Sequence, residues 1–257
     1  MSKGKVLIIS IVLVFLGLVS FLIYQVNYKK SKYLYLFTGD TEKVKWYYNN
    51  DTWYTANTNK MLKDKFQVYT NGNYSGDYNL VYNDKWYFFD DNNNSVDILG
   101  NFMINTNFEF KSNSFTSNRI EDSEITNKLR KKFSDNNKNY EVVLNEINID
   151  NNQEPLKVYT ISFKEISNEY EVIGPDYTAI FTYINNKVGL IREINFLRND
   201  SLSPCYLNLE GVFTFENKNT KLLVSCEHYD VTPSDYYLFE KKGNQYKLLI
   251  DTLGGGK

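Results

Sequence analysis

The sequence predicts a mainly β fold of antiparallel hairpins, with one or two short helices, preceded by one transmembrane helix. Three observations predict this fold class. Residues 6–24 are apolar and uncharged. From residue 33 onward, Tyr, Phe, Val, Ile and Thr fall in short runs separated by Asn, Asp and Gly, which is typical of strands and turns. Two segments, beginning at Thr58 and Ser123, place apolar residues at helical spacing.

The apolar run at residues 6–24 is long enough to cross a bilayer, because as a helix it measures roughly 28 Å. A cleaved signal peptide usually has about 7 to 15 apolar residues before a small-x-small site, which is missing here. We therefore expect an uncleaved anchor rather than a cleaved signal peptide or a buried soluble helix. Residues 1–5 then form a short cytoplasmic tail and residues 25–32 a basic juxtamembrane segment.

Lysines flank this run on both sides, at positions 3 and 5 before it and at positions 29, 30 and 32 after it. The positive charges on the two sides are therefore nearly equal, and the positive-inside rule favours neither orientation clearly. Because the tail before the run is so short, we expect it to stay in the cytoplasm, with the carboxy-terminal domain extracellular. Lysine outnumbers arginine and Asn, Ile and Tyr are abundant, which is typical of an AT-rich genome and suits a bacterial cell surface.

Turn residues locate several hairpins beyond the run. Asn71-Gly72 and Asn185-Asn186 each separate two strand-like runs, and both pairs tolerate positive φ. Residues 242–244 join a further pair. In the last strand, residues 245–250, apolar side chains occur at both odd and even positions. This pattern predicts a strand that is covered on both faces or that buries one face only loosely.

The better helix candidate begins near Ser123, which can cap it. Ile125, Leu129 and Phe133 then lie on one stripe, with cationic residues near the end of the helix. The shorter candidate, residues 58–65, has Met61, Leu62 and Phe66 as its buried edge. We expect both helices to pack on a sheet as connectors.

Residues 133–139 lack apolar side chains after Phe133 and are the best candidate for a linker. A first β-rich half would then span residues 33–132 and a second residues 140–253, before a flexible tail at residues 254–257. One domain of two subdomains and two independent domains both suit this length. Residues 45–51 recur in similar form at residues 85–91, a spacing that would suit a propeller-like arrangement.

Composition and charge exclude several classes of function. The chain is 42% hydrophobic, which excludes disorder for the chain as a whole. Five of the 29 basic residues precede residue 33, and the remaining 24 face 31 acidic residues, so no nucleic-acid partner is expected. His228 is the only histidine, which excludes zinc sites built on several histidines. Neither a G-x-S-x-G elbow nor a phosphate-binding loop occurs, and we assign no catalytic residue.

Cys205 and Cys226 are the only cysteines and lie in or beside predicted strands. A disulfide between them would stabilise the fold by roughly 3 kcal/mol on the chain-entropy estimate. Free buried thiols are the alternative, which the sequence slightly favours because the compartment is itself inferred.

Two loops carry oxygen-bearing side chains at alternate positions, as a calcium ion requires. They are Asp90, Asn92, Asn94 and Asn148, Asp150, Asn152. Both lack the turn glycine and the distal Glu of an EF-hand, so ordinary Asx-rich turns are favoured over calcium. We predict no cofactor and no metal site.

Two stretches resemble known repeat families. Residues 146–154, followed by the strand-like residues 157–161, resemble a degenerate FG-GAP or integrin-α-type propeller repeat, and residues 215–225 are similar. That resemblance implies propeller blades with calcium-binding loops, although Gln153 stands where the family has Gly. Residues 81–90 resemble the hairpin core of a choline- or glucan-binding cell-wall repeat, without its closing Gly-Trp or its tandem repetition. This second resemblance implies a cell-wall partner.

Trp46, Trp53 and Trp86 could form a stacking platform for sugars or quaternary ammonium groups, although we expect core packing for each. Together, these features predict a single-pass membrane-anchored protein with an external β-rich binding or interaction module. Its partner would be the cell wall or another protein. The alternative is a cell-surface hydrolase of cell-wall glycan, which needs two carboxylates about 5 to 10 Å apart across a cleft.

Overall fold

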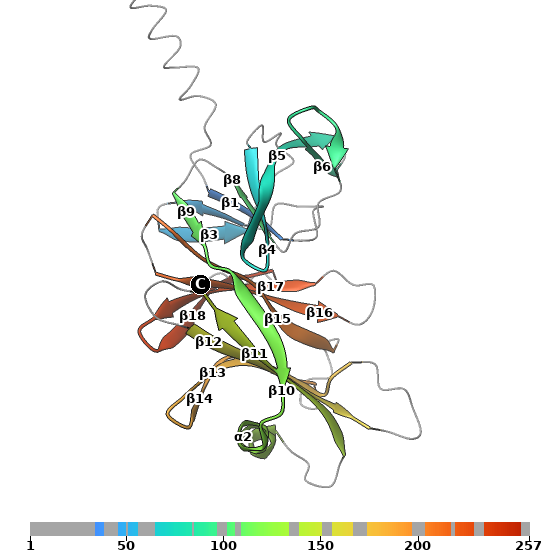
Figure 1. Ribbon diagram of the computed structural model, residues 1–257, viewed down its shortest axis with the longest axis vertical. Coiled ribbons are helices and arrows are strands. Elements are labelled where there is room, and N and C mark those ends of the chain that lie inside the picture. Colours follow the sequence, from blue (N-terminus) through green and yellow to red (C-terminus); the bar gives the residue numbers. More distant parts are fainter. Residues whose placement is uncertain are drawn as a thin grey trace, which may run out of the picture.

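The computed structural model describes 13 stretches of the chain and places their strands in three antiparallel sheets with one helix, α2 (Figure 1). The described residues are 34–38, 46–49, 51–55, 65–83, 85–96, 102–105, 109–133, 139–150, 156–166, 174–196, 204–216, 219–228 and 234–252. Their mainly β character agrees with the sequence prediction.

The first sheet has eight strands in the order β3-β2-β1-β8-β4-β5-β6-β7. Its strands are β1 (Leu34–Thr38), β2 (Trp46–Asn49), β3 (Thr52–Thr55), β4 (Lys65–Thr70), β5 (Asn73–Asn83), β6 (Lys85–Phe89), β7 (Ser95–Val96) and β8 (Phe102–Asn105).

The second and third sheets have five strands each, in the orders β10-β11-β12-β13-β14 and β18-β17-β16-β15-β9. The second contains β10 (Phe115–Ile120), β11 (Tyr140–Ile149), β12 (Leu156–Glu165), β13 (Tyr177–Ile184) and β14 (Lys187–Asn195). The third contains β9 (Phe110–Ser112), β15 (Cys205–Phe215), β16 (Lys221–His228), β17 (Asp235–Lys242) and β18 (Gln245–Asp251).

The three sheets stack as layers, with the third sheet in the middle (Figure 1). One face of the third sheet shares a core with the second sheet, in which Val158 and Ile180 meet Val224 and Phe239. The opposite face shares a core with the eight-stranded sheet. Strands of the middle layer are therefore apolar on both faces, as the sequence of residues 245–250 predicts for β18.

The predicted hairpin turns are confirmed, because each adopts the left-handed backbone conformation that its residues tolerate. Asn71 and Gly72 have φ of 49° and 76° between β4 and β5, and Asn185 and Asn186 have φ of 50° and 59° between β13 and β14. Gly243 has φ of 60° between β17 and β18.

Helix α2 (Ser123–Phe133) lies on the outer face of the second sheet, where Ile125 and Leu129 pack into a third core. Its cap is Asp122 rather than Ser123, because an Asp122 carboxylate oxygen accepts the backbone N–H groups of Glu124 and Ile125 at 2.9 and 3.0 Å. A carboxylate there also interacts favourably with the helix dipole.

The predicted linker at residues 133–139 lies between two strands of one sheet. Phe133 ends α2 and residues 134–138 lie outside the described residues, but β10 and β11 on either side of them are hydrogen-bonded neighbours. Strands β9 and β10, from the predicted first half, belong to the third and second sheets. The chain therefore crosses from the eight-stranded sheet to the other two between β8 and β9.

The predicted fold class is wrong in two respects. No helix of the described residues is long and apolar enough to span a membrane, whereas the prediction included a transmembrane helix at residues 6–24, which lie outside that part of the chain. The described strands form sheets of eight, five and five strands rather than the four-stranded blades of a propeller. Residues 58–64 of the predicted shorter helix also lie outside the described residues, and Lys65 begins β4.

Candidate functional site

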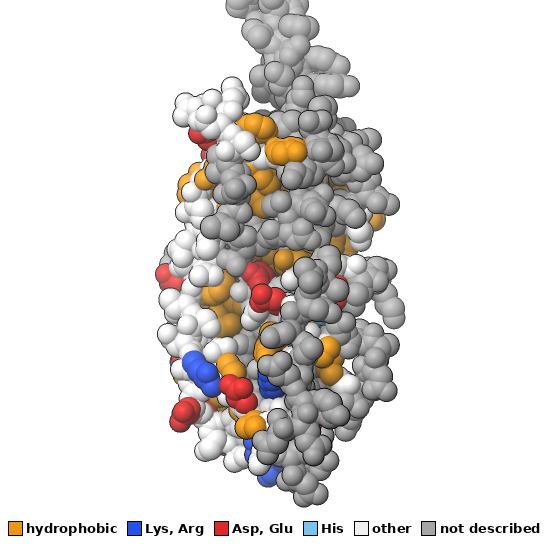
Figure 2. Space-filling model, turned by 90° about the vertical axis from the view of Figure 1, so that its right-hand side faces the viewer, with side chains coloured by type: hydrophobic (Ala, Val, Ile, Leu, Met, Phe, Trp, Pro, Cys, Tyr) orange, Lys and Arg blue, Asp and Glu red, His pale blue; other side chains and the backbone are white. Residues whose placement is uncertain are grey.

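Hydrophobic side chains on the face shown in Figure 2 gather in several small groups rather than one broad patch. Charged side chains of both signs lie among them in the part formed by the two five-stranded sheets. The described side chains on this face therefore form no broad apolar patch, and the concave regions are the better candidates for a site.

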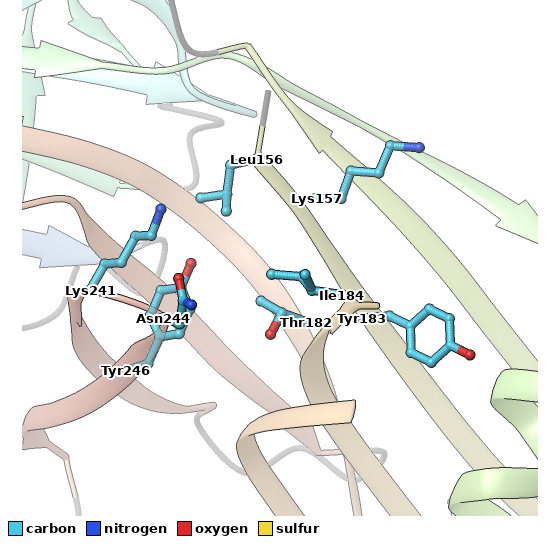
Figure 3. A pocket seen from close by; sticks show the side chains of 8 residues that line it. All are labelled: Leu156, Lys157, Thr182, Tyr183, Ile184, Lys241, Asn244 and Tyr246. Carbon is cyan, nitrogen blue, oxygen red and sulfur yellow. The ribbon is translucent and has the colours of Figure 1, made fainter. Parts of the chain in front are cut away.

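A cavity of about 340 Å³ opens at one end of the two packed five-stranded sheets, and we call it the sandwich pocket (Figure 3). It is lined by Leu156, Lys157, Thr182, Tyr183, Ile184, Lys241, Asn244 and Tyr246. The first five come from β12 and β13, and the last three from the β17–β18 hairpin. Its volume lies at the lower end of the range for small-molecule sites, about 300–1,000 Å³.

Strand alternation decides which side chains face the sandwich pocket. Leu156 shares the inward face of β12 with the core residue Val158, and Thr182 shares that of β13 with Ile180. The pocket is therefore a continuation of the apolar interior between the two sheets. Ile184 lies at its rim and is 52% exposed.

Lys157 and Tyr183 lie on the opposite face of the same sheet, and their side chains point away from the cavity (Figure 3). The Lys157 ammonium pairs with Glu146 at 3.2 Å. The Tyr183 hydroxyl donates to Glu124 of α2 at 2.8 Å and accepts from Lys128 at 2.8 Å. Both residues line the pocket, but the polar ends of their side chains are bonded elsewhere.

Lys241 faces the cavity from the third sheet. In β17, Tyr237 and Phe239 point into the core shared with the second sheet, so Lys241 continues the same face. Its neighbours Glu240 and Lys242 lie on the other face, where they pair with each other at 3.1 Å. Lys241 forms no ion pair or side-chain hydrogen bond within the described part of the chain.

Tyr246 is the second distinctive group of the sandwich pocket. Its ring packs against the sandwich core, and its hydroxyl is buried without a hydrogen-bond partner. Burial raises the pKa of Tyr246 to about 12, so the hydroxyl remains protonated at neutral pH. An unsatisfied buried hydroxyl costs about 1–3 kcal/mol, and this one lies beside a cavity in which a ligand could accept its hydrogen bond.

The second pocket, of about 420 Å³, lies where the β4–β5 turn meets β10 and β11. Two residues of a predicted calcium loop, Asn148 and Asp150, line it. Their recorded bonds are internal to the protein: the Asp150 N–H donates to Ser114 O at 2.9 Å, and the Asn148 amide donates to Glu146 at 3.0 Å. Asn152 lies outside the described residues.

The other predicted loop is an Asx turn. Asp90 accepts the backbone N–H groups of Asn92 and Asn94 at 2.9 and 2.8 Å and the Asn94 amide at 3.0 Å. These bonds from Asn94 and Asn92 lower the pKa of Asp90. Within the stretches that the structure describes, no group of three or more His, Cys, Asp or Glu residues could hold a metal ion.

Neither Trp46 nor Trp53 lies on an exposed platform. Trp46 and Trp53 are 0% and 6% exposed, and both belong to the core between the eight-stranded sheet and the third sheet. The side chain of Trp86 lies outside the described part of the chain, and only its backbone in β6 is described. The core packing that the sequence favours is thus observed for Trp46 and Trp53.

Cys205 and Cys226 form a disulfide between β15 and β16, with their Cα atoms 5.3 Å apart. This is the alternative that the sequence slightly disfavours. The strand register makes the disulfide possible. Cys226 lies opposite Leu207, and Leu207 is the next residue after Cys205 on the same face of β15. The bridge belongs to the sandwich core.

His228 lies at the opposite end of the sandwich from the pocket. Its Nε2 is 3.3 Å from an Asp235 oxygen, and the other Asp235 oxygen accepts the Thr252 hydroxyl at 3.2 Å. Its Nδ1 is buried without a partner. Neither of the two pockets includes this pair of residues, and the neighbouring Cys226 is held in the disulfide.

Sequence reasoning missed the residues of the sandwich pocket. Lys241 and Tyr246 lie opposite each other in a hairpin that the sequence predicts. The other lining residues, in β12 and β13, are more than fifty residues away along the chain. The only local signal was the lysine at an inward-facing position of β17, after Tyr237 and Phe239.

No family model, curated protein or solved structure matches this chain.

Proposed function

We propose that this chain is a membrane-associated protein whose β-rich region lies outside the cell and acts as a binding module. Association with the membrane would use the uncharged residues 6–24. The sandwich pocket would be the binding site, with a small molecule as its ligand. A cell-wall component or a partner protein could present that ligand, and the acidic excess beyond residue 32 does not favour nucleic acid.

The sandwich pocket is the observation that carries this proposal. It combines apolar walls with a few polar groups, Lys241, Asn244 and Tyr246, that converge from one hairpin. Binding sites for small molecules typically have this composition. Two sheets with a shared core hold its walls in place, so the site is formed before the ligand arrives.

The alternative, a hydrolase of cell-wall glycan, needs two carboxylates that face each other across a cleft. The sandwich pocket has no carboxylate in its lining, and the second pocket has only Asp150. Two carboxylates outside both pockets, Asp176 and Glu193, have structural partners. Asp176 accepts the Glu165 N–H at 2.7 Å, and Glu193 accepts the Tyr177 hydroxyl at 2.9 Å. The geometry therefore favours a binding module.

A thermal-shift screen of the full-length chain with small anions, cations and neutral compounds tests the proposal, because a ligand that binds only the native state raises the melting temperature. Ile184→Trp fills the mouth of the sandwich pocket and should abolish the shift. Ile166→Trp is the matched control, since Ile166 is 59% exposed and does not line the pocket. A shift that survives Ile184→Trp, or the absence of any stabilising compound, would contradict the proposal.

A further inference from the structure

We infer that the sandwich pocket takes a small organic anion, with a carboxylate or phosphate head against Lys241 and a short apolar part against Leu156 and Ile184. This inference rests on the proposed function and adds the chemical class of the ligand.

Lys241 supplies the charge that selects an anion. It occupies the inward face of β17, directly after the core residues Tyr237 and Phe239. Long lysine side chains often reach solvent from such positions while their methylene groups cover apolar surface. Here the side chain extends across the cavity towards Leu156 of the opposite sheet (Figure 3). Its ammonium group is therefore placed over the cavity.

Two acids of the described residues near the pocket, Glu240 and Glu146, are engaged elsewhere. Glu240 lies on the opposite face of β17 and pairs with Lys221 at 2.9 Å and Lys242 at 3.1 Å. Glu146 pairs with Lys157 on the far face of the second sheet. The lining itself holds no carboxylate. Among the residues that the structure describes, Lys241 thus has no counter-charge at this partly apolar site, and such a positive charge attracts an anion and disfavours a cation.

The neutral polar groups of the hairpin are also suited to an oxyanion. The Tyr246 hydroxyl has no acceptor in the protein and, because burial raises its pKa to about 12, it keeps its proton at neutral pH. The Asn244 amide lines the same wall. Thr182 is not a free donor, since its hydroxyl donates to Gly189 O at 3.4 Å. Lys241, Asn244 and Tyr246 thus offer donors from one hairpin.

The opposite wall suits an apolar group. Leu156 belongs to the margin of the sandwich core, and Ile184 is 52% exposed at the rim. Covering such a side chain with a ligand removes apolar surface from water, which is favourable at about 25 cal/mol per Å². A ligand that has both a charged head and an apolar part would therefore use both walls, whereas acetate or inorganic phosphate would use only one.

Calorimetric titration of the full-length chain in a mild non-ionic detergent tests the inference, with detergent alone as the blank. The probes are hexanoate, hexyl phosphate, hexanol and hexylamine. We expect one or both anions to bind at least about tenfold more tightly than hexanol, because a charge-assisted hydrogen bond is worth about that factor, and hexylamine to bind most weakly. A preference between hexanoate and hexyl phosphate identifies the head group.

Lys241→Gln should weaken anion binding about tenfold and leave hexanol binding unchanged. Lys247→Gln is the matched control, since it removes the same charge from the exposed side of the same hairpin. It should change neither anion binding nor hexanol binding. Tyr246→Phe is a second variant that should weaken anion binding without lowering the melting temperature.

Anions that bind Lys241→Gln as tightly as the unsubstituted chain, or hexylamine that binds as tightly as hexanoate, would overturn the inference. If hexanol or hexylamine binds and Ile184→Trp blocks it, the binding site stands and only the ligand class is wrong. If none of the four probes binds, the inference fails, and only the wider screen decides whether the proposed function fails with it.

Discussion

A β-carbon at Gly72 would lie 1.9 Å from the carbonyl oxygen of Asn113. The β4–β5 turn of the eight-stranded sheet therefore contacts the segment between β9 and β10 directly, backbone to backbone. The Phe115 N–H donates to Asn71 O at 3.1 Å, and the Asn113 amide donates to Asp150 O at 3.0 Å. Asn113 thus links the turn to the ends of the other two sheets.

This contact predicts that Gly72→Ala destabilises the protein by about 2–4 kcal/mol, since the methyl group meets backbone that cannot move aside cheaply. Gly243→Ala is the matched control, because Gly243 also has positive φ, +60°, but nothing lies within 4 Å of its would-be β-carbon. The free energy of unfolding of Gly243→Ala should fall only by the cost of placing alanine in a left-handed backbone conformation, about 1–2 kcal/mol. Equal losses in urea unfolding of the two variants would contradict a close contact at Gly72.

The pair formed by Lys221 and Glu240 is the most buried ion pair in the described part of the chain. The Lys221 side chain is 2% exposed, and its ammonium group lies 2.9 Å from a Glu240 oxygen. Glu240→Gln removes the carboxylate charge that faces this buried ammonium and should cost about 3 kcal/mol. Glu124→Gln is the control, since the Glu124–Lys128 pair is exposed and exposed pairs contribute about 0–1 kcal/mol.

The same pair predicts a dependence of stability on pH. Burial raises the pKa of Glu240, but hydrogen bonds from Lys221 and Lys242 outweigh burial and hold the pKa below its usual value of 4.5. A lowered native pKa adds stability above the unfolded value, and that stability is lost as pH falls through the native pKa. Below about pH 4.5, the free energy of unfolding of Glu240→Gln should therefore fall less steeply with decreasing pH than that of the unsubstituted protein. Identical acid profiles for the two proteins would argue against this role for Glu240.

Two tyrosines, one buried and one partly buried, provide a test of the unsatisfied hydroxyl. The Tyr177 hydroxyl donates to Glu193 at 2.9 Å, whereas that of Tyr246 has no partner. Tyr177→Phe should lower the free energy of unfolding by about 1–2 kcal/mol, and Tyr246→Phe should leave it unchanged or raise it by about 1 kcal/mol. Chemical denaturation measures both, and a comparable loss in the two variants would show that Tyr246 has a partner in solution.

The disulfide closes a loop between residues separated by 21 positions. Removing it with the double substitution Cys205→Ala and Cys226→Ala should destabilise the protein by roughly 3 kcal/mol. Non-reducing mass spectrometry of protein from its native compartment should find the two peptides linked. Alkylation of both thiols without prior reduction would contradict the bond.

The proposed external location predicts the outcome of limited proteolysis. Protease added to intact cells or spheroplasts should digest the β-rich region while the amino-terminal fragment stays with the membrane fraction. The control is lysed cells, in which digestion should be the same. Protection of the β-rich region in intact cells but not in lysed cells would show the opposite orientation.

Local chemistry allowed the turns and the main helix to be predicted. Asn71-Gly72 and Asn185-Asn186 suit positive φ wherever they occur, and Ile125 and Leu129 form an apolar stripe only in a helix. The cap was misplaced by one residue, because Asp122 and Ser123 are both good capping residues and only the geometry distinguishes them. The transmembrane helix of the predicted fold class is not found in the described residues, and residues 6–24 lie outside them. The described strands form sheets of eight, five and five strands rather than the propeller-like arrangement that the sequence left open.

By itself, the sequence determined that this protein is mainly β, where its hairpins turn and that β18 is apolar on both faces. The tertiary structure decided which strands share a sheet, so that β9 and β10 leave the first half of the chain and join the second. It also paired Cys205 with Cys226 and brought Lys241 to Leu156 across two sheets. The physical reason is that turns depend on the backbone preferences of adjacent residues, whereas strand pairing and pocket walls depend on packing between residues far apart in the chain.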